Sequence, residues 1–312
     1  MPTRNGGARW RECLAGLARQ RPAPAALVVI DSGSHDGTRE AAERAGARVI
    51  TVAPEEFNHG EARNRAADAL PAVDAIVFLV QDAVPQGEDF LATLERAARQ
   101  PGVAAATARQ VPPRDAGFLT ASTVSASPFA SGEPRRTGPL SPQQAGELTP
   151  ERWRPLLLLD DIACAVRADV FRASGYRSTR HGEDALLAYD LLCAGWALCH
   201  EPAAVVEHGH SYDADSVVPR YRDDARFFRE TFGYRVRPDL LSVLKGYNAE
   251  LRRDRRWLAE HPGQAPPDAM AAARRLRWSQ VLAQREGSRG PLGELPRPRA
   301  VPGPLQVPQV PA

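Results

Sequence analysis

Short apolar runs alternate with helix-forming stretches in the first part of the chain, and this order constrains the fold more than any other feature. The runs are rich in β-branched residues and bounded by turn-forming residues, as buried strands are. The expected strands and helices lie in turn at residues 27–30, 38–44, 48–52, 61–70 and 76–80. Gly46 is placed to end the first of these helices. Such β-α-β order predicts an α/β fold with a mainly parallel central sheet flanked by helices.

The rest of the chain divides by composition. Its 312 residues suffice for one large α/β domain with a substantial core. A stretch rich in Pro, Ser, Gly and Thr interrupts the pattern, and a Pro-rich segment ends the chain. The predicted divisions are a first half at 1–110, a flexible loop or insertion at 111–155, a second half at 156–236, a C-terminal helical region at 237–285 and a disordered tail at 286–312.

Bulk composition argues against several classes of protein. The net charge is only +2, with 40 Lys and Arg against 38 Asp and Glu, so no nucleic-acid partner is indicated. The four cysteines show no metal-ligand spacing, and we expect them to be reduced. The chain has no apolar signal core at its start and no run near the ~20 apolar residues of a membrane span. We therefore expect a cytoplasmic protein, with peripheral contact at the inner face of a membrane left open.

Two of the expected strands end in a carboxylate. Asp31 follows the run at 27–30, and Asp82 follows the run at 76–80 in the segment VFLVQDAVP. In α/β sheets, ligands bind at the carboxyl ends of the strands. Asp82 is therefore either a metal ligand or only the polar end of a strand.

Two turn-helix segments offer further polar groups near these strand ends. In DSGSHDGT, residues 31–38, small residues allow the chain to turn and Asp36 lies next to the start of a helix. In FNHGEARNRAAD, residues 57–68, Arg63 and Asn64 lie near a helix start, where a basic group can meet a diphosphate. The alternatives are a capped turn in the first segment and a solvated arginine in the second.

The second half carries an acidic pair and a histidine pair. Glu183 and Asp184 lie at the expected N-terminus of a helix, where the helix dipole would keep a carboxylate ionised, as a general base must be. The alternative is a helix cap without further function. In VVEHGH, His208 and His210 are two residues apart, so on a continuing strand both share one face and can reach a metal beside Asp82. A structural role for the two histidines is the competing interpretation.

Taken together and in this order, the motifs resemble the glycosyltransferase family 2 enzymes of the GT-A fold, in their rhamnosyltransferase-like branch. The motifs that carry the resemblance are PTRNGG at 2–7, DSGSHDGT at 31–38, EEFNHGEARN at 55–64, VFLVQDAVP at 77–85, GEDALLAYDLLCAGW at 182–196 and EPAAVVEHGHSY at 201–212. The resemblance implies the fold of the nucleotide-diphospho-sugar transferases. It makes residues 1–110 the nucleotide-sugar-binding half and residues 156–236 the acceptor-binding and catalytic half.

The resemblance also implies roles for individual residues. Asp82 matches the last aspartate of the family's D-x-D motif, whose first position is Val80 here. Asp82 would be the main ligand of Mg²⁺ or Mn²⁺, with His208 as a further ligand and His210 in reserve. The implied catalytic base is Asp184, with Glu183 as its neighbour. The residues implied to bind the donor are Asp31, Ser32, Asp36, Arg63, Asn64, Gln81 and Asp82.

The implied activity is metal-dependent, inverting transfer of a sugar from a nucleotide-sugar donor. Rhamnose is the sugar suggested by the branch. The acceptor would be a hydroxyl in a polysaccharide, a lipid-linked saccharide or a small molecule. Two alternatives remain open: a nucleotidyltransferase, and a non-catalytic nucleotide-sugar-binding relative.

The two ends of the chain raise separate questions. Relatives have a first strand of the type VSVVIPTYN, but this chain begins at Met1, where that strand should have ended. We therefore expect the first strand to be missing, either because the chain is truncated or because the protein is a degenerate relative. Near the other end, the Arg-rich helical stretch at 251–277 is interpreted as a solvated face in preference to a surface for anionic lipid or a partner.

Overall fold

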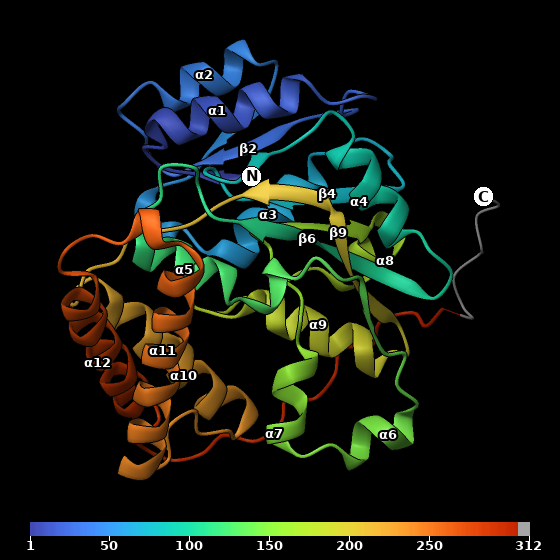
Figure 1. Ribbon diagram of the computed structural model, residues 1–312. Helices are drawn as coiled ribbons and strands as arrows, with labels where there is room; N and C mark the ends of the chain where they lie inside the picture. The colour runs from blue at the N-terminus through green and yellow to red at the C-terminus, as the bar shows by residue number, and fades with distance from the viewer. Residues whose placement is uncertain (305–312) are drawn as a thin grey trace.

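The computed structural model describes residues 1–304 and confirms the expected α/β fold, with a curled central sheet covered by helices (Figure 1). The strands form two sheets. The first is parallel, and its strands in order are β1 (Pro2–Thr3), β2 (Val28–Asp31) and β3 (Arg48–Thr51). The second is mixed, and its strands in order are β4 (Ala75–Leu79), β8 (Ala163–Arg167), β6 (Val103–Val111), β9 (Ala197–Glu207) and β5 (Val84–Pro85), with β7 (Arg135–Thr137) pairing with β9.

The first strand, expected to be missing, is present as β1. Pro2 and Thr3 pair in parallel with Ile30 and Asp31 of β2, and the Ile30 amide donates a hydrogen bond of 2.9 Å to the carbonyl of Met1. The end of the strand is therefore present, because two residues are enough to pair with the end of β2.

The direction of β8 also departs from the expected mainly parallel sheet. β8 runs antiparallel to β4, with Leu79 opposite Ala163, and antiparallel to β6 as well. The amino end of β8 therefore lies beside the carboxyl end of β4. This crossing of directions brings residues just before β8 to the edge where Asp82 follows β4.

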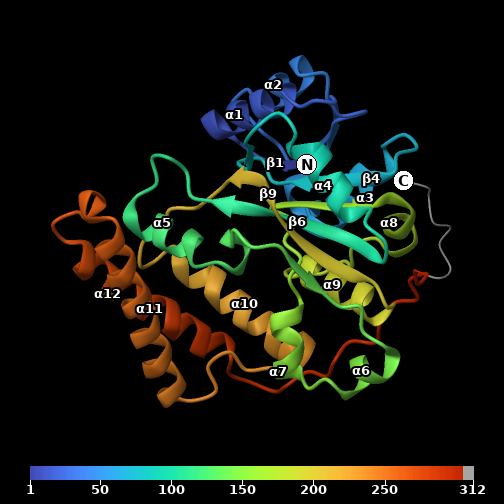
Figure 2. The ribbon, with the colours of Figure 1, turned by 45° about the vertical axis from the view of Figure 1, so that its right-hand side comes forward.

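Helices cover both faces of the sheets (Figures 1 and 2). The helices packed closest to the strands are α1 (Gly7–Ala18), α2 (Thr38–Arg44), α3 (His59–Asp68), α4 (Phe90–Ala98), α8 (Ala168–Ser174) and α9 (Glu183–Cys193). α4 is amphipathic and buries Phe90 and Leu94, three to four residues apart on one face. α9 is apolar around most of its surface because it lies inside the molecule, where Leu187 and Leu191 are fully buried. No helix within residues 1–304 has the length and apolar character needed to cross a membrane.

Residues 111–155, predicted to be a flexible loop, contain short regular elements. These are α5 (Phe118–Ser125), β7, α6 (Pro142–Glu147) and α7 (Pro150–Trp153). The composition suggested little apolar burial, but Phe118 and Trp153 are both buried in the core. Two large aromatic side chains anchor the segment although its average composition is polar. Its flexibility stays a prediction.

The C-terminal region is helical, as expected, and forms a separate layer beside α5 (Figure 2). It consists of α10 (Val217–Phe232), α11 (Leu240–Glu260) and α12 (Ala269–Gly287). The tail at 286–312 was predicted to be disordered, but residues 288–304 run along the body of the protein. The indole of Trp196 donates to the carbonyl of Pro302 at 2.7 Å, and the amide of Arg299 donates to Asp190 at 3.0 Å. The remainder of the predicted tail, 305–312, lies outside the described residues.

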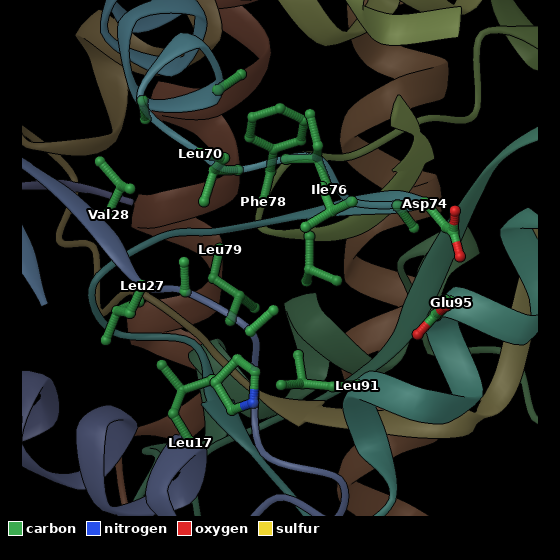
Figure 3. A pocket seen from close by; sticks show the side chains of 18 of the residues that line it. Leu17, Leu27, Val28, Leu70, Asp74, Ile76, Phe78, Leu79, Leu91 and Glu95 are labelled. Carbon is green, nitrogen blue, oxygen red and sulfur yellow. The ribbon is translucent and has the colours of Figure 1, made fainter. Parts of the chain in front are cut away.

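A hollow of about 430 Å³, which we call the inter-sheet hollow, separates β2 from β4 (Figure 3). Its walls include Leu27 and Val28 on one side and Ile76 and Leu79 on the other. It exists because β1 pairs with only the last residues of β2, so among residues 1–304 no strand lies between the earlier part of β2 and the edge of β4. The lining is almost wholly apolar, which does not suit a diphosphate.

Candidate active site

A second cavity of about 640 Å³, the strand-end pocket, opens at the carboxyl end of β4. The amino ends of β8 and α9 and the residues after β9 complete its wall. Most of the residues predicted from the sequence to form the site line this pocket. They are Ser32, Arg63, Gln81, Asp82, Glu183, Asp184, His208 and His210.

The aspartate and the two histidines predicted to hold a metal come together. The carboxylate oxygen Oδ2 of Asp82 lies 3.6 Å from Nε2 of His208 and 3.6 Å from Nδ1 of His210. The two imidazole rings are almost perpendicular, with centroids 4.8 Å apart. One ligand atom from each residue lies within 4.8 Å of the others, which is a spacing that a shared metal ion can fill.

The state of His208 fits a metal ligand. Its Nε2 atom is buried and has no hydrogen-bond partner among the described residues, 1–304. Burial lowers the pKa of His208 to about 4, although the nearby Asp82 carboxylate opposes the shift. The ring is therefore neutral at physiological pH and has a lone pair available. A buried polar atom without a partner is rare, and a bound cation is one way to satisfy it.

A second acidic cluster lies on the same pocket. Asp160, Asp161 and Asp184 each place a carboxylate oxygen within 4.8 Å of the others. Asp160 is held by the side-chain amide of Gln110, which donates to it at 2.8 Å, and by the amide of Ile162 at 3.0 Å. Burial raises the pKa of Asp161 to about 6, while the guanidinium of Arg63 opposes this shift. Three carboxyl groups this close cannot all be ionised without a compensating cation.

The helix dipole was expected to keep Asp184 ionised, and the structure corrects this expectation. Burial raises the pKa of Asp184 well above its ordinary value, and the charges of Asp161, Asp160 and Glu183 raise it further. The hydrogen bond that Asp184 accepts from the amide of Ala185 acts in the opposite direction. Desolvation and like charge therefore outweigh the helix N-terminus.

Gly182 precedes α9 and sets the position of Glu183 and Asp184, the first two residues of that helix. This residue has φ of +76°, a left-handed conformation that favours glycine. A Cβ atom here would lie 2.3 Å from the ring of Phe227 in α10. Any other residue would strain the backbone and displace α10, so this close approach fixes where the acidic pair emerges.

Arg63 lines the pocket but is not free to meet a diphosphate. Its Nη1 atom lies 2.8 Å from Glu183 and 3.0 Å from Asp161, and its side chain is only 2% exposed. The buried guanidinium therefore holds two carboxylates in place. Glu183, predicted as the neighbour of the catalytic base, is the ion-pair partner of Arg63.

The pocket has other cations that the sequence analysis did not single out. Arg4, Arg180 and Arg220 all line it. None of the three has a carboxylate within ion-pairing distance in residues 1–304. Arg4 follows β1, Arg180 lies in the loop before α9 and Arg220 lies on α10, so no single sequence motif could have grouped them.

Three predicted donor-binding residues do not line the pocket, and their side chains stabilise turns and loops. Asp31 accepts hydrogen bonds from the amides of Gly33 and Ser34. Asp36 accepts from Thr38 at the start of α2 and from the amide of Gly7, and these bonds lower its pKa. Asn64 exchanges two hydrogen bonds with the backbone of Tyr176, which joins α3 to the loop after α8. In the structure, Asp31 and Asp36 therefore cap a turn, which was the alternative interpretation of the segment DSGSHDGT.

Asp160 and Asp161 are the acidic residues that the sequence analysis missed. They follow four leucines and precede β8, so they stand before a strand and not after one. The rule that ligands bind at the carboxyl ends of parallel strands therefore does not predict these two residues. Only the antiparallel pairing of β8 with β4 brings them to the edge near Asp82.

Comparison with known proteins identifies the family. A family model described as glycosyl transferase family 2 matches residues 1–149. The O-antigen chain rhamnosyltransferase WbaN of Salmonella anatum is 32% identical over 230 residues, which cover 73% of this chain and 70% of WbaN. The chain belongs to glycosyltransferase family 2. The O-antigen chain rhamnosyltransferase RfbN of Salmonella typhimurium strain LT2 is 29% identical to this glycosyltransferase over the same shares of both chains.

The fold of the glycosyltransferase also matches a solved structure. The mannosyltransferase PcManGT from Pyrobaculum calidifontis, in complex with GDP-Man and Mn²⁺, superposes with a TM-score of 0.54. The superposition covers 92% of this chain and 84% of that one, at 18% identity. At this identity the likeness concerns the fold, and it confirms the expected GT-A class.

Proposed function

We propose that this glycosyltransferase transfers a sugar, with inversion and with the help of a divalent cation, from a nucleoside-diphosphate donor to a hydroxyl of a saccharide. One observation carries the proposal. The Asp82, His208 and His210 cluster and the Asp184 cluster lie on one pocket, so a cation site and a candidate base share the space of one donor and one acceptor.

Asp82, His208 and His210 would hold the cation. Two imidazole nitrogens beside one carboxylate favour Mn²⁺ over Mg²⁺, because Mg²⁺ prefers oxygen ligands throughout. When bound, a divalent cation would neutralise charge that develops on the departing diphosphate. Arg4, Arg180 and Arg220 are the unpaired cations placed to bind the remaining phosphate charge.

Asp184 would act on the acceptor. In a single displacement, the acceptor oxygen bonds to the anomeric carbon as the bond from that carbon to the phosphate oxygen breaks. The proton of the acceptor hydroxyl passes to a carboxylate oxygen of Asp184, and the nucleoside diphosphate leaves with the bonding electrons. This step needs Asp184 in its ionised form, and the positive charge of a cation bound in the pocket would lower the pKa that burial and the neighbouring carboxylates raise. Ser32 and Gln81 line the pocket beside Asp82 and are proposed to contact the donor. Attack from the face opposite the leaving group inverts the anomeric centre.

Rhamnose as the donor sugar and a saccharide as the acceptor rest on the relatives. Both curated relatives named above are O-antigen chain rhamnosyltransferases. A saccharide chain offers the hydroxyl that the reaction requires.

The test is thermal stabilisation of the purified protein by a panel of nucleoside diphosphates and nucleotide sugars, including dTDP-rhamnose, with and without Mn²⁺. We expect one nucleotide class to raise the melting temperature only when Mn²⁺ is present, because ligands that bind the folded state stabilise it. In Asp82→Ala this shift should vanish. The matched control is Asp68→Ala, which removes an exposed carboxylate on α3 away from the pocket and should leave the shift unchanged.

Two outcomes would contradict the proposal. A folded protein that responds to no nucleotide under any condition would favour a non-catalytic relative. Release of pyrophosphate from a nucleoside triphosphate and a sugar phosphate would identify a nucleotidyltransferase. Incubation with an acceptor saccharide and the stabilising donor, followed by NMR of the product linkage, then tests inversion directly.

A further inference from the structure

Exposed apolar side chains gather on one part of the molecule. Within residues 1–304, five of the six large apolar side chains that are exposed belong to α11 and α12. They are Leu240, Leu241, Leu244, Trp278 and Leu282, with exposures of 71%, 59%, 50%, 42% and 43%. The sixth, Leu292, lies in the segment after α12. Exposed apolar groups that cluster in this way mark an interaction surface more often than scattered ones do.

The five side chains form a stripe on two helices that pack against each other. On α11, Leu240 and Leu244 are one helical turn apart, and on α12 so are Trp278 and Leu282. The ring of Tyr247, one turn beyond Leu244, contacts the ring of Trp278 with centroids 5.2 Å apart. We call this stripe the α11/α12 face.

Cations without partners accompany the stripe. Lys245, Arg252, Arg255, Arg256 and Arg274 are exposed on the same two helices, and none makes an ion pair in the described part of the chain. The exposed carboxylates are fewer: Glu260 and Glu286 within the two helices, and Asp239 and Asp268 at their N-caps. The α11/α12 face therefore combines apolar groups with an excess of positive charge.

We propose that the α11/α12 face docks the protein onto the surface of an anionic phospholipid bilayer. Leucine and tryptophan side chains of an interfacial helix insert at the level of the headgroups, and lysine and arginine bind lipid phosphates. A protein partner or a second copy would cover the apolar stripe but would leave five unpaired cations unexplained unless its own surface were acidic. The charge excess favours the bilayer.

The position of the face relates it to the strand-end pocket. α12 packs against α10, and α10 carries Arg220 at the pocket (Figures 1 and 2). α1 and α2 lie at the opposite end of the molecule. Docking through α11 and α12 would thus hold the strand-end pocket nearer to the membrane than α1 and α2. The proposal stands on the two helices alone and does not depend on the chemistry proposed for the pocket.

The experiment is co-sedimentation of the full chain with vesicles of phosphatidylcholine alone and of phosphatidylcholine mixed with phosphatidylglycerol. We expect sedimentation with the anionic vesicles, little with the neutral ones, and release at high salt because screening weakens surface electrostatics. The double variant Leu244→Asp/Trp278→Asp should lower the bound fraction about tenfold, because it places charge in the stripe. The change is at exposed positions, so melting temperature should be preserved.

Two matched controls separate this surface from general stickiness. Leu292→Asp changes the exposed leucine outside the stripe and should bind vesicles like the wild type. Arg11→Ala/Arg19→Ala removes two exposed cations near α1, whereas Arg255→Ala/Arg256→Ala removes two from α11, and only the second pair should weaken binding.

Three results would overturn the proposal. The wild type could remain in the supernatant with both kinds of vesicle. Leu292→Asp could lose as much binding as the stripe variant. Sedimentation velocity could show a wild-type dimer that the stripe variant converts to a monomer, without vesicle binding by either, which would assign the face to self-association.

Discussion

Strand β4 borders two cavities of opposite chemistry. Along its edge, Ile76 and Leu79 face the inter-sheet hollow, which is lined by leucine, valine, alanine and proline (Figure 3). Just beyond its carboxyl end, Asp82 faces the strand-end pocket with its carboxylates, histidines and arginines. The two cavities differ in size by less than a factor of two, so volume does not distinguish them.

The difference shows what makes a cavity a candidate active site. In the inter-sheet hollow, the charged residues Asp74 and Glu95 stand at the margin (Figure 3), and both are neutralised by an ion pair with Arg99. In the strand-end pocket, buried groups have perturbed pKa values, and the buried nitrogens His208 Nε2 and Arg63 Nε have no hydrogen-bond partner within residues 1–304. Holding groups in such states costs free energy in the folded protein, and such groups are concentrated at functional sites. We therefore expect changes at the hollow to alter stability and changes at the pocket to alter activity.

The largest expected effect is on turnover by Asp184→Asn. The amide cannot accept the hydroxyl proton, so transfer of sugar from the stabilising donor should fall roughly a thousandfold. Donor-dependent thermal stabilisation should remain, because the Asp82 cluster is intact. Asp68→Asn on α3 is the control and should retain full turnover. Equal loss of turnover and donor stabilisation in Asp184→Asn would mean that Asp184 binds the donor and is not the base.

Leu79→Ala, at the inter-sheet hollow, should lower stability and leave turnover unchanged. Leu79 is 2% exposed, and its truncation should lower the free energy of unfolding by about 3 to 4 kcal/mol through lost burial and a larger cavity. Chemical denaturation measures this change, with Leu292→Ala, a change at an exposed leucine, as the control. Turnover per folded molecule should stay near that of the wild type. If fully folded Leu79→Ala protein lost most of its turnover, the hollow would affect activity as well as stability, and the proposed distinction between the two cavities would be wrong.

The smallest of the three effects is on the pH dependence of stability. The pKa of Asp161 is raised from 3.8 to about 6, so the folded state favours the protonated form. The resulting stabilisation is present below pH 4 and is lost as the pH rises through 6. Between pH 4 and pH 7, the wild type should therefore lose on the order of 2 to 3 kcal/mol relative to Asp161→Asn, since one pKa unit corresponds to about 1.4 kcal/mol. Parallel stability curves for the two proteins would show that the pKa of Asp161 is not raised.

Local patterns in the sequence predicted most elements of the first half. The expected helix at 38–44 is α2, and the strand expected at 76–80 is displaced by one residue in β4. The same patterns misled where context decides. The helix expected at 61–70 is α3 at His59–Asp68, so both of its ends were misplaced by two residues. Propensity acts over a few residues, so it predicts element type well and boundaries or pairing partners less well.

In the candidate site, too, the sequence predicted some contacts between residues and not others. The spacing of His208 and His210 and the strand-end position of Asp82 suggested that they meet, and in the structure they do. The pairing of Arg63 with Glu183 and Asp161 joins residues about a hundred positions apart and left no local signal.

By itself the sequence determined the α/β class, the strand that delivers Asp82, the helix that begins at the acidic pair, and the family. These follow from short-range periodicity, turn chemistry and motif order, all of which are local. Only the tertiary structure decided that β8 runs antiparallel to β4, that Asp160 and Asp161 join the site, and which arginines remain unpaired. It also decided that Asp184 has a raised pKa, because desolvation and the charge of neighbours depend on groups that the fold, and not the chain, places side by side.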